Sequence, residues 1–485
     1  MFAPTSATRR RVALGALRLA TWGAAFSAFA AVRIAAIADR PPARFPDTAS
    51  YLVLDLSHRG LRPWVVPLVY SLLSSDDARI AVQCAAAIVL WCALAYAVAC
   101  TLRCWPLKVA GAGAVLLVGA SPQVTRWDLA LLSESLALSL TAAVIATWLM
   151  FAVKHTRGWG TAARVMTALW AFTREPHLAL LPVILVLLAL SLAWPNGRRT
   201  RALLLLTLVP ICAWGAATMT HSSAMTDYNV YLLLQERVFP NHRRVEWFVR
   251  NGHMPTSKAI LTSRGFVSRS DLSRQLLHQA EIPVGIDPPT VVERGGDVFV
   301  HWVHEHGAAT YLDYLTHHPG FAFTRPWEDV DTMLAPRLHA ISPHVRADPV
   351  LSEGVTAALF QNMDRYFDAL VVGLMLTLVA WRRPRLGVSM VGLSVLASSG
   401  VLLYIAWHGA AIELSRHAIV ASVASRIAII ILVVAGIDRI LSRAAPRRRP
   451  PTAAPPPGAD STDEALPPIR WRDVDEPVPA LTATG

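Results

Sequence analysis

The sequence is poor in charged side chains. Asp, Glu, Lys and Arg together make up 16% of its 485 residues, whereas 54% are hydrophobic. Soluble domains of ordinary composition carry about 25% charged residues. The shortage therefore excludes a set of soluble domains and indicates a chain that crosses a membrane several times.

Cysteine is also scarce, and its five positions have no paired spacing. They lie in or beside apolar runs, at Cys84, Cys92, Cys100, Cys104 and Cys212. Disulfide-rich secreted domains and structural zinc sites both need regularly spaced cysteines. The sequence therefore implies neither a disulfide framework nor a zinc site.

Acidic residues are fewer than basic ones, 33 against 45, which gives a formal net charge of +12. In nucleic-acid-binding proteins the basic residues form a continuous patch or stripe. Here many of them sit in short clusters between apolar runs, where they set membrane orientation. We therefore expect no nucleic-acid partner.

Long apolar runs dominate the rest of the chain, and a transmembrane helix needs ~20 such residues. The runs at 109–121 and 161–173 are shorter, so they must include flanking residues or enter the membrane partway. We predict an all-α polytopic membrane protein with about ten transmembrane helices. The runs are 12–38, 78–102, 109–121, 131–153, 161–173, 176–194, 202–219, 366–380, 386–407 and 418–441.

The first run has a competing interpretation. Ala28-Phe29-Ala30 has the small-x-small form of a signal-peptide cleavage site. We prefer an uncleaved first span, because the run continues past that site, and cleavage stays open. Arg18 and Arg33, near the ends of this span, are expected to extend toward the membrane surfaces.

Basic clusters occur at every second connection, as the positive-inside rule requires of cytoplasmic loops. They lie at 9–11, 103–108, 154–157, 198–201, 382–385 and 443–449. Ten spans with both termini in the cytoplasm account for all six clusters. The chain is then expected to be a multi-pass protein of the bacterial plasma (inner) membrane.

This topology divides the chain into four regions. Residues 1–219 hold spans one to seven, with a first outer loop at 39–77, and residues 366–441 hold the last three spans. Residues 220–365 form an extracytoplasmic insertion of mostly short helices, and residues 442–485 form a disordered, Pro-rich cytoplasmic tail. The insertion contains HWVHEH, whose spacing does not place its histidines on one helical face as HExxH does, so we assign no metal site.

The first outer loop contains the most unusual stretch, RFPDTASYLVLDLSHRGLRPWVVPLVY at 44–70. It mixes acidic and basic side chains with the apolar residues of an interfacial helix. Asp47 follows Pro46 and could take the proton of a hydroxyl group. A solvated loop that joins two spans is the alternative.

Three other polar clusters face the same side. Ser133-Glu134-Ser135 opens the fourth span, TREPH forms a tip at 173–177, and ELSRH at 413–417 precedes the last span. Each has a purely structural explanation. A helix dipole would stabilise Glu134, and the Arg174 and His177 side chains would extend to the membrane interface. Glu413 would pair with Arg416 on one face of a helix. Arg416 with His417 would equally suit a phosphate.

The order of PDxxxY, GLRPxxxPLxY, SExL, TRE and ExxRH resembles integral-membrane glycosyltransferases of the GT-C superfamily. Within it, the sequence is most similar to the RgtA-like and dolichyl-phosphate-mannose-type families. The resemblance covers roughly residues 10–220 and 366–441. It implies transfer of a sugar from a polyprenyl-phosphate carrier to an acceptor on the extracytoplasmic face.

The resemblance also implies roles for residues. Asp47 matches the catalytic base of the first loop. An acidic pair in protein mannosyltransferases is replaced here by Asp47-Thr48, which leaves metal use and the acceptor class open; no cofactor is assigned. The expected partners are a lipid-linked sugar donor, an envelope glycan, lipid or protein acceptor, and the membrane. The expected substrate-binding residues are Arg62, Glu134, Arg174, His177, Arg416 and His417.

Two other classes of function compete with glycosyl transfer. A polytopic transporter or flippase of a lipid-linked or envelope substrate would show broken or polar mid-membrane helices and repeat symmetry, and neither is clear here. A membrane scaffold that displays the insertion would leave the three polar clusters unexplained.

Overall fold

The computed structural model describes residues 6–45, 47–56, 62–180, 202, 209–210, 213, 223–256, 261, 296–335, 351–380, 386–411 and 413–444. Contacts divide the chain into two compact units, 1–442 and 443–485. The candidate site and the elements discussed below belong to the first unit, apart from residues 443–444 at the end of the last helix.

The described residues form helices and no strand, so the predicted all-α polytopic class is confirmed. Five helices are long and apolar enough to cross a membrane. A sixth span is added if α5 (Trp105–Ala120) and the segment Pro122–Leu129, which is bent by 51° relative to α5, count as one. The five are α1 (Ser6–Ile37), α4 (Asp76–Thr101), α7 (Glu134–Lys154), α21 (Leu386–Gly409) and α22 (Leu414–Ala444).

Ten spans stay a prediction. The short runs at 161–173 and 366–380 fall in α8 (Arg157–Ala171) and α20 (Met363–Ala380), helices of 15 and 18 residues. Most of the runs at 176–194 and 202–219 lies outside the described residues, as does nearly all of the expected tail.

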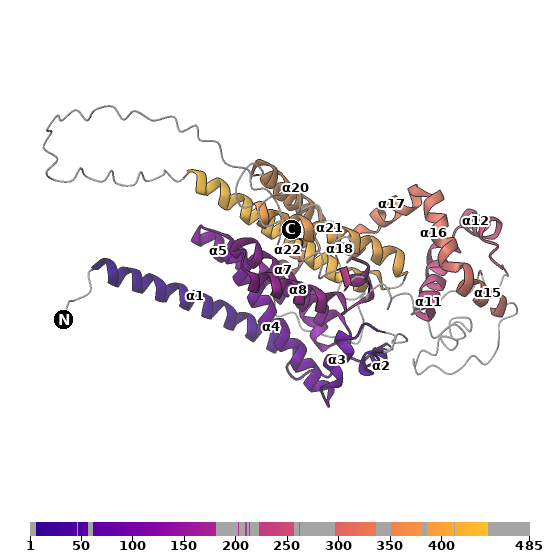
Figure 1. Cartoon of the computed structure of the whole chain (residues 1–485), viewed down its shortest axis with the longest axis horizontal. Coiled ribbons are helices and arrows are strands. Elements are labelled where there is room, and N and C mark those ends of the chain that lie inside the picture. The colour runs from indigo at the N-terminus through magenta and orange to yellow at the C-terminus, as the bar shows by residue number, and fades with distance from the viewer. Residues whose placement is uncertain are drawn as a thin grey trace, which may run out of the picture. The chain divides into compact units, whose positions relative to one another are not determined.

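The membrane helices pack around α4 and α7. Helix α4 contacts α1, α5 (Trp105–Ala120) and α7, and α7 also contacts α8 and α21, as Figure 1 shows. Their apolar side chains form the main core, in which Trp91, Leu94 and Leu149 are fully buried. At Gly119 an added Cβ would lie 2.6 Å from the Trp91 ring, so α5 approaches α4 closely only because this residue is glycine.

Arg33 of α1 is buried inside the bundle, whereas the sequence predicts that its side chain extends toward a membrane surface. It is 1% exposed, and its Nη2 lies 2.6 Å from Oδ2 of Asp128, which is fully buried. Its Nη1 donates to the Gly119 carbonyl at 2.7 Å. Because an unpaired charge in an apolar bundle is costly, Arg33 binds its partner inside the protein instead of extending toward the membrane surface.

The chain bends after α5, and this bend creates the loop that leads into α7. Pro122 follows Ser121 and starts α6 (Pro122–Thr125), and the 3₁₀ turn η1 (Arg126–Leu129) continues it. The Asp128 carboxylate in this turn also accepts a hydrogen bond from Ser135 Oγ at 2.7 Å. The Asp128 carboxylate is thereby paired within the bundle, with Arg33 and with Ser135.

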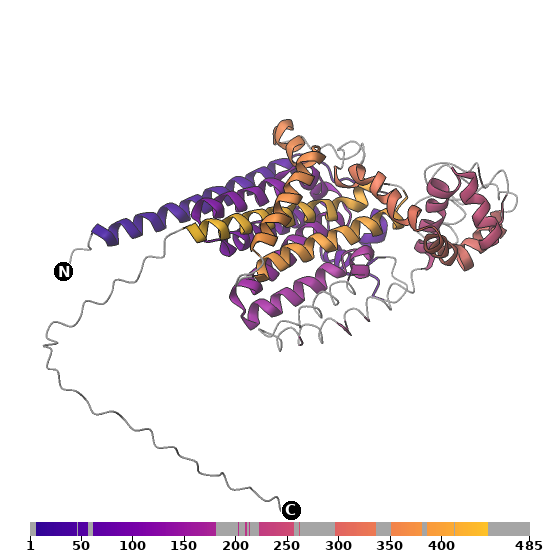
Figure 2. The ribbon, with the colours of Figure 1, turned by 90° about the horizontal axis from the view of Figure 1, so that it is seen from above.

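The described parts of the insertion are short helices, as predicted. They have their own core, in which Tyr231, Phe248 and Phe299 are fully buried. Figure 2 shows this group of helices. They are α11 (Ser223–Leu233), the π-helical η2 (Leu234–Val238), α12 (His242–Gly252), α15 (Gly296–Trp302), the π-helical η3 (Val303–Gly307), α16 (Ala308–His317), α17 (Pro319–Glu328) and α18 (Val330–Leu334).

The insertion is attached to the C-terminal end of α21 (Leu386–Gly409). The Tyr311 hydroxyl lies 3.1 Å from His408 Nδ1, and the Trp407 indole donates to Asp329 at 2.7 Å. The guanidinium of Arg237 lies 3.4 Å from the centre of the Trp407 ring. The remaining elements are α2 (Thr48–Leu52), α3 (Val65–Ser71) and α19 (Glu353–Phe360).

Candidate functional site

The first outer loop is fixed to the loop before α7 by main-chain hydrogen bonds. The Ala43 amide donates to the Leu129 carbonyl at 2.8 Å, and the Leu131 amide donates to the Ala43 carbonyl at 3.1 Å. This pair forms the parallel bridge between Ala43 and Ala130. It places Asp47, four residues after Ala43, close to the start of α7.

Asp47 directly precedes the short helix α2. The Phe45 amide donates to Thr48 Oγ1 at 2.8 Å, and Ser50 Oγ donates to the Asp47 carbonyl at 2.7 Å. These local bonds stabilise the turn and leave the Asp47 carboxylate free to face other segments. The adjacent Tyr51 is buried, and its hydroxyl lies 3.3 Å from Ser133 Oγ.

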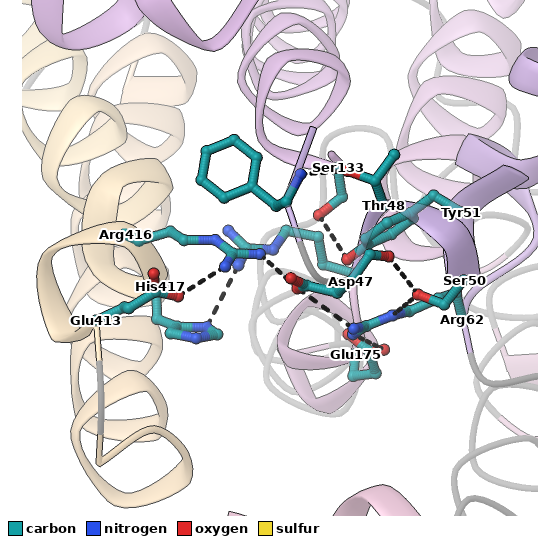
Figure 3. Close-up of polar contacts among 12 residues, drawn as sticks. Asp47, Thr48, Ser50, Tyr51, Arg62, Ser133, Glu175, Glu413, Arg416 and His417 are labelled. Atoms are coloured by element: carbon teal, nitrogen blue, oxygen red, sulfur yellow. Dashed lines mark hydrogen bonds and ion pairs between the residues drawn. The ribbon is translucent and has the colours of Figure 1, made fainter. Parts of the chain in front are cut away.

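Arg416, near the start of α22, is the centre of the polar cluster, which Figure 3 shows. Its Nη2 donates to Asp47 Oδ2 at 2.8 Å, its Nε to Glu134 Oε1 at 2.8 Å and its Nη1 to Glu413 Oε2 at 2.7 Å. The Arg416 side chain is 6% exposed. One buried guanidinium thus joins carboxylates from three segments, two of which lie about 280 and 370 residues away in sequence.

Glu413 pairs with Arg416 as the sequence suggested, and its backbone is unusual. Its φ of 54° lies in the left-handed region, which non-glycine residues rarely adopt. The Arg416 and His417 amides both donate to the Glu413 carbonyl, at 2.8 and 3.1 Å. The first turn of α22 is therefore arranged around this residue.

The TREPH tip supplies a second cation. Arg174 Nη2 lies 3.4 Å from Glu134 Oε1 and 3.4 Å from His417 Nδ1. These contacts are longer than those of Arg416, so Arg174 is held more loosely by the carboxylates. Its side chain is 6% exposed.

Arg62 supplies the third cation, on the side of the first loop. Its Nη2 lies 3.5 Å from Asp47 Oδ2, its Nη1 lies 3.4 Å from Glu175 Oε1, and its Nε donates to Ser50 Oγ at 3.0 Å. The guanidinium also lies 4.7 Å from the centre of the Tyr51 ring. Figure 3 shows Asp47 between Arg62 and Arg416.

The two guanidinium groups control the ionisation of Asp47. Burial raises the pKa of its carboxyl group, but the charges of Arg416 and Arg62 and the hydrogen bond from Arg416 outweigh this effect. The pKa of Asp47 falls to about 2. Asp47 is therefore fully ionised at neutral pH and is held in an ion pair.

Glu134 carries an oxygen with no hydrogen-bond partner among the described residues. Its side chain is 0% exposed, and Oε1 binds Arg416 and Arg174. Its other oxygen, Oε2, is buried and accepts no hydrogen bond from any residue that the structure describes. A buried carboxylate oxygen without a donor is costly, which suits a position where a ligand supplies a hydroxyl group.

The structure brings six of the seven residues named from the sequence into one connected cluster: Asp47, Arg62, Glu134, Arg174, Arg416 and His417. His177 lies beside the cluster. Its ring stacks on Trp170 at 4.2 Å, and its Nδ1 lies 2.9 Å from Thr173 Oγ1. In this position His177 supports the TREPH tip.

The sequence analysis placed Glu175 and Ser133 within its polar clusters but did not name either of them as a site residue. Glu175 lies inside TREPH, of which only Arg174 and His177 were predicted to bind substrate, and in the structure it pairs with Arg62. Asp55, another acidic residue of the stretch at 44–70, is exposed, whereas only 28% of the Asp47 side chain is exposed. Position in the cluster therefore favours Asp47.

The carboxylates of the cluster bind guanidinium groups and are not arranged around a common centre. Within the described residues, no three His, Cys, Asp or Glu side chains are grouped so as to hold a metal ion. The histidines of HWVHEH include His304, whose Nδ1 lies 2.6 Å from Asp227 Oδ2 of α11. This pair joins two helices of the insertion.

Chemically, the cluster offers an ionised carboxylate, three guanidinium groups and one carboxylate oxygen that lacks a donor. The carboxylate can accept a proton, and guanidinium groups bind phosphate oxygens. The main core of apolar helices adjoins it. An amphiphilic anion that carries hydroxyl groups matches all these features.

Comparisons with known proteins identify no family. No protein-family model and no curated protein sequence matches the chain. Among solved structures it is similar to the archaeal oligosaccharyltransferase AglB from Archaeoglobus fulgidus, in complex with an inhibitory peptide and a dolichol-phosphate, at a TM-score of 0.41 and 12% identity. The match covers 88% of this chain and 52% of AglB, so the chain spans about half the length of that protein. A likeness at this level carries no argument about the activity of this chain.

Proposed function

We propose that this protein is a membrane glycosyltransferase of the GT-C type, which moves a sugar from a polyprenyl-phosphate carrier to an acceptor on the extracytoplasmic face. The observation that carries the proposal is the binding of Arg416 to Asp47, Glu134 and Glu413 at once. In an apolar chain, a cluster of this charge density next to membrane helices suits an anionic lipid with a reactive head group.

Asp47 is the general base in this reaction. Its oxygen removes the proton from the acceptor hydroxyl while that hydroxyl oxygen forms a bond to the anomeric carbon of the sugar. The bond between that carbon and the phosphate oxygen breaks, and the electron pair leaves with the phosphate. Attack opposite the leaving group inverts the anomeric configuration.

Arg174 and Arg416 stabilise the phosphate that leaves. Positioned guanidinium groups are suited to this role because they bind the growing negative charge without rearranging. The cluster contains the four carboxylates of Asp47, Glu134, Glu175 and Glu413 against the three guanidinium groups of Arg62, Arg174 and Arg416. The cluster therefore has one more carboxylate than guanidinium group. An incoming phosphate must compete with these carboxylates for the arginines.

This competition couples donor binding to the base. When the phosphate takes over a contact of Arg416, the ion pair that holds Asp47 weakens. The basicity of Asp47 then rises, because the charge that lowers its pKa is shared with the phosphate. Glu134 Oε2, which has no donor among the described residues, accepts a hydrogen bond from a hydroxyl group of the transferred sugar.

The test is product formation by the purified protein in lipid vesicles that contain a radiolabelled polyprenyl-phosphate sugar. The wild type is expected to transfer label to an octyl glycoside acceptor. Asp47→Asn keeps the shape of the side chain and is expected to lower turnover by roughly 10²–10⁴-fold, the range for a lost acid or base. Asp55→Asn, in the same loop, is the matched control and is expected to keep near wild-type turnover.

Three outcomes would contradict the proposal. Near-normal turnover in Asp47→Asn would remove Asp47 as the base, and loss only in Asp55→Asn would move the role to that residue. Movement of the intact lipid-linked sugar across the bilayer without a new glycosidic bond would identify a transporter.

A further inference from the structure

The extracytoplasmic insertion carries a buried tyrosine on the helix that contacts the membrane region. Tyr228 belongs to α11, is 7% exposed and packs in the core of the insertion. Ala411 packs against the same core, and Glu413 follows it two residues later. Helix α11 also contacts α21. The insertion thus meets the membrane region at the turn that carries Glu413.

The Tyr228 hydroxyl has no hydrogen-bond partner among the described residues, although the oxygen is buried. An unsatisfied buried hydroxyl destabilises the fold, so native structures rarely keep one without a reason. The neighbouring Tyr231 shows the usual arrangement: its hydroxyl accepts a hydrogen bond from Gln235 of the same segment.

The surroundings of Tyr228 keep its hydroxyl protonated. Burial raises the pKa of Tyr228, and nearby groups raise it further, among them the carboxylates of Asp47 and Glu413. The phenol is thus a hydrogen-bond donor whose pKa responds to the charges of Asp47 and Glu413, and among the described residues it is bonded to neither carboxylate.

The acceptor is the substrate that fits this position. The lipid-linked donor is expected to reach the cluster from the side of α7, at whose start Glu134 pairs with Arg174. Tyr228 comes from the insertion, on the side expected to face water, from which a hydrophilic acceptor enters. A carbohydrate acceptor has a hydroxyl group to give a proton to Asp47 and another oxygen beside it to accept a hydrogen bond.

We propose that Tyr228 is an acceptor-binding residue, whose hydroxyl donates a hydrogen bond to an oxygen of a carbohydrate acceptor next to the hydroxyl that Asp47 deprotonates. This inference rests on the proposed glycosyl transfer. It assigns the insertion a direct part in the site, as the element that completes the acceptor position.

The test compares Tyr228→Phe with Tyr231→Phe in the full chain, with a radiolabelled polyprenyl-phosphate sugar as donor and octyl glycosides as acceptor probes. Tyr228→Phe removes one hydrogen bond and is expected to raise the KM for the octyl glycoside roughly three- to tenfold. The KM for the donor is expected to stay unchanged. Tyr231→Phe, on the same helix, is expected to change neither value.

A second measurement does not need turnover. Binding of the octyl glycoside to the Asp47→Asn protein, measured by its thermal stabilisation, is expected to weaken when Tyr228→Phe is added and not when Tyr231→Phe is added. An unchanged acceptor KM, an equal rise in donor KM, or the same effect in both tyrosine variants would overturn the role of Tyr228 while leaving glycosyl transfer intact. Absence of any transfer in the wild type would instead overturn the proposed function.

Discussion

At the scale of single residues, the arginines of the site differ in how firmly the carboxylates hold them. Arg416 makes three hydrogen bonds of 2.7–2.8 Å to carboxylates, whereas the contacts of Arg174 are 3.4 Å long. Removing Arg416 would leave Glu134 buried without its main counterion, which disturbs folding as well as binding. Arg174 is therefore the cleaner probe of phosphate binding.

We expect Arg174→Ala to raise the KM for the lipid-linked donor by roughly ten- to a hundredfold, because a hydrogen bond to a charged group contributes about 1.5–3 kcal/mol. The KM for the acceptor should change little. Steady-state kinetics with varied donor checks this, and Arg250→Ala, whose side chain is 75% exposed in the insertion, is the control. Unchanged donor dependence would remove Arg174 from the phosphate site.

A second residue-scale prediction concerns pH. The pKa of Asp47 in the folded protein is about 2, against an ordinary value of 3.8. Because the folded pKa is the lower one, the ion pair stabilises the fold above about pH 4, and this contribution is lost as the pH falls toward 2. A difference of this size corresponds to about 2 kcal/mol.

We therefore expect the wild type to lose more thermal stability than Asp47→Asn between pH 5 and pH 2. Scanning fluorimetry of both proteins in the same detergent measures the difference. Parallel pH profiles for the two proteins would show that the ion pair contributes no such stability.

At the scale of elements, the buried pair of Arg33 and Asp128 connects α1 to the turn that leads into α7. The same turn carries main-chain carbonyls bound by Gln83, at Asp128 and Ala130, both at 3.2 Å. Gln83 in turn accepts a hydrogen bond from Tyr70 of α3 at 3.1 Å. Four segments thus fix the approach to Glu134 without touching its carboxylate.

We expect Arg33→Met to destabilise the protein by roughly 3–5 kcal/mol, because it leaves the Asp128 carboxylate buried without its cation. The double variant Arg33→Met with Asp128→Asn should recover much of this loss, since the amide can still accept a hydrogen bond from Ser135. Unfolding of the single and double variants in detergent checks the order. A double variant no more stable than Arg33→Met would contradict the charge argument.

The sequence predicted elements better than contacts between elements. Hydrophobic runs located α4, α7, α21 and α22 because apolar length is a local property of the chain. The motifs also named most of the cluster. Neither could show that one guanidinium would bind carboxylates from three segments, because such contacts depend on packing across hundreds of residues. The same limit explains why the sequence predicts that Arg33 extends toward a membrane surface. Its partner Asp128 lies 95 residues away, and no local pattern indicates the pair.

At the scale of the whole molecule, the orientation in the membrane decides on which side the reaction occurs. Single cysteines at Ser71, His306 and Arg157, all exposed positions, test it in a variant that lacks the five native cysteines. The positive-inside rule predicts that an impermeant thiol reagent labels Ser71→Cys and His306→Cys in intact cells, and Arg157→Cys only after permeabilisation. Labelling of Arg157→Cys alone would invert the topology and place the candidate site in the cytoplasm.

The main-chain pairing of Ala43 with Leu129 and Leu131 has a consequence for how this protein can vary. Because amides and carbonyls make these bonds, they do not depend on the identity of the side chains that line the site. The spacing between the first loop and the start of α7 is thus largely independent of the side chains around it. Residues that line the site can change to suit a different sugar or acceptor while the two loops keep their separation, which makes this region a practical target for redesigning substrate choice.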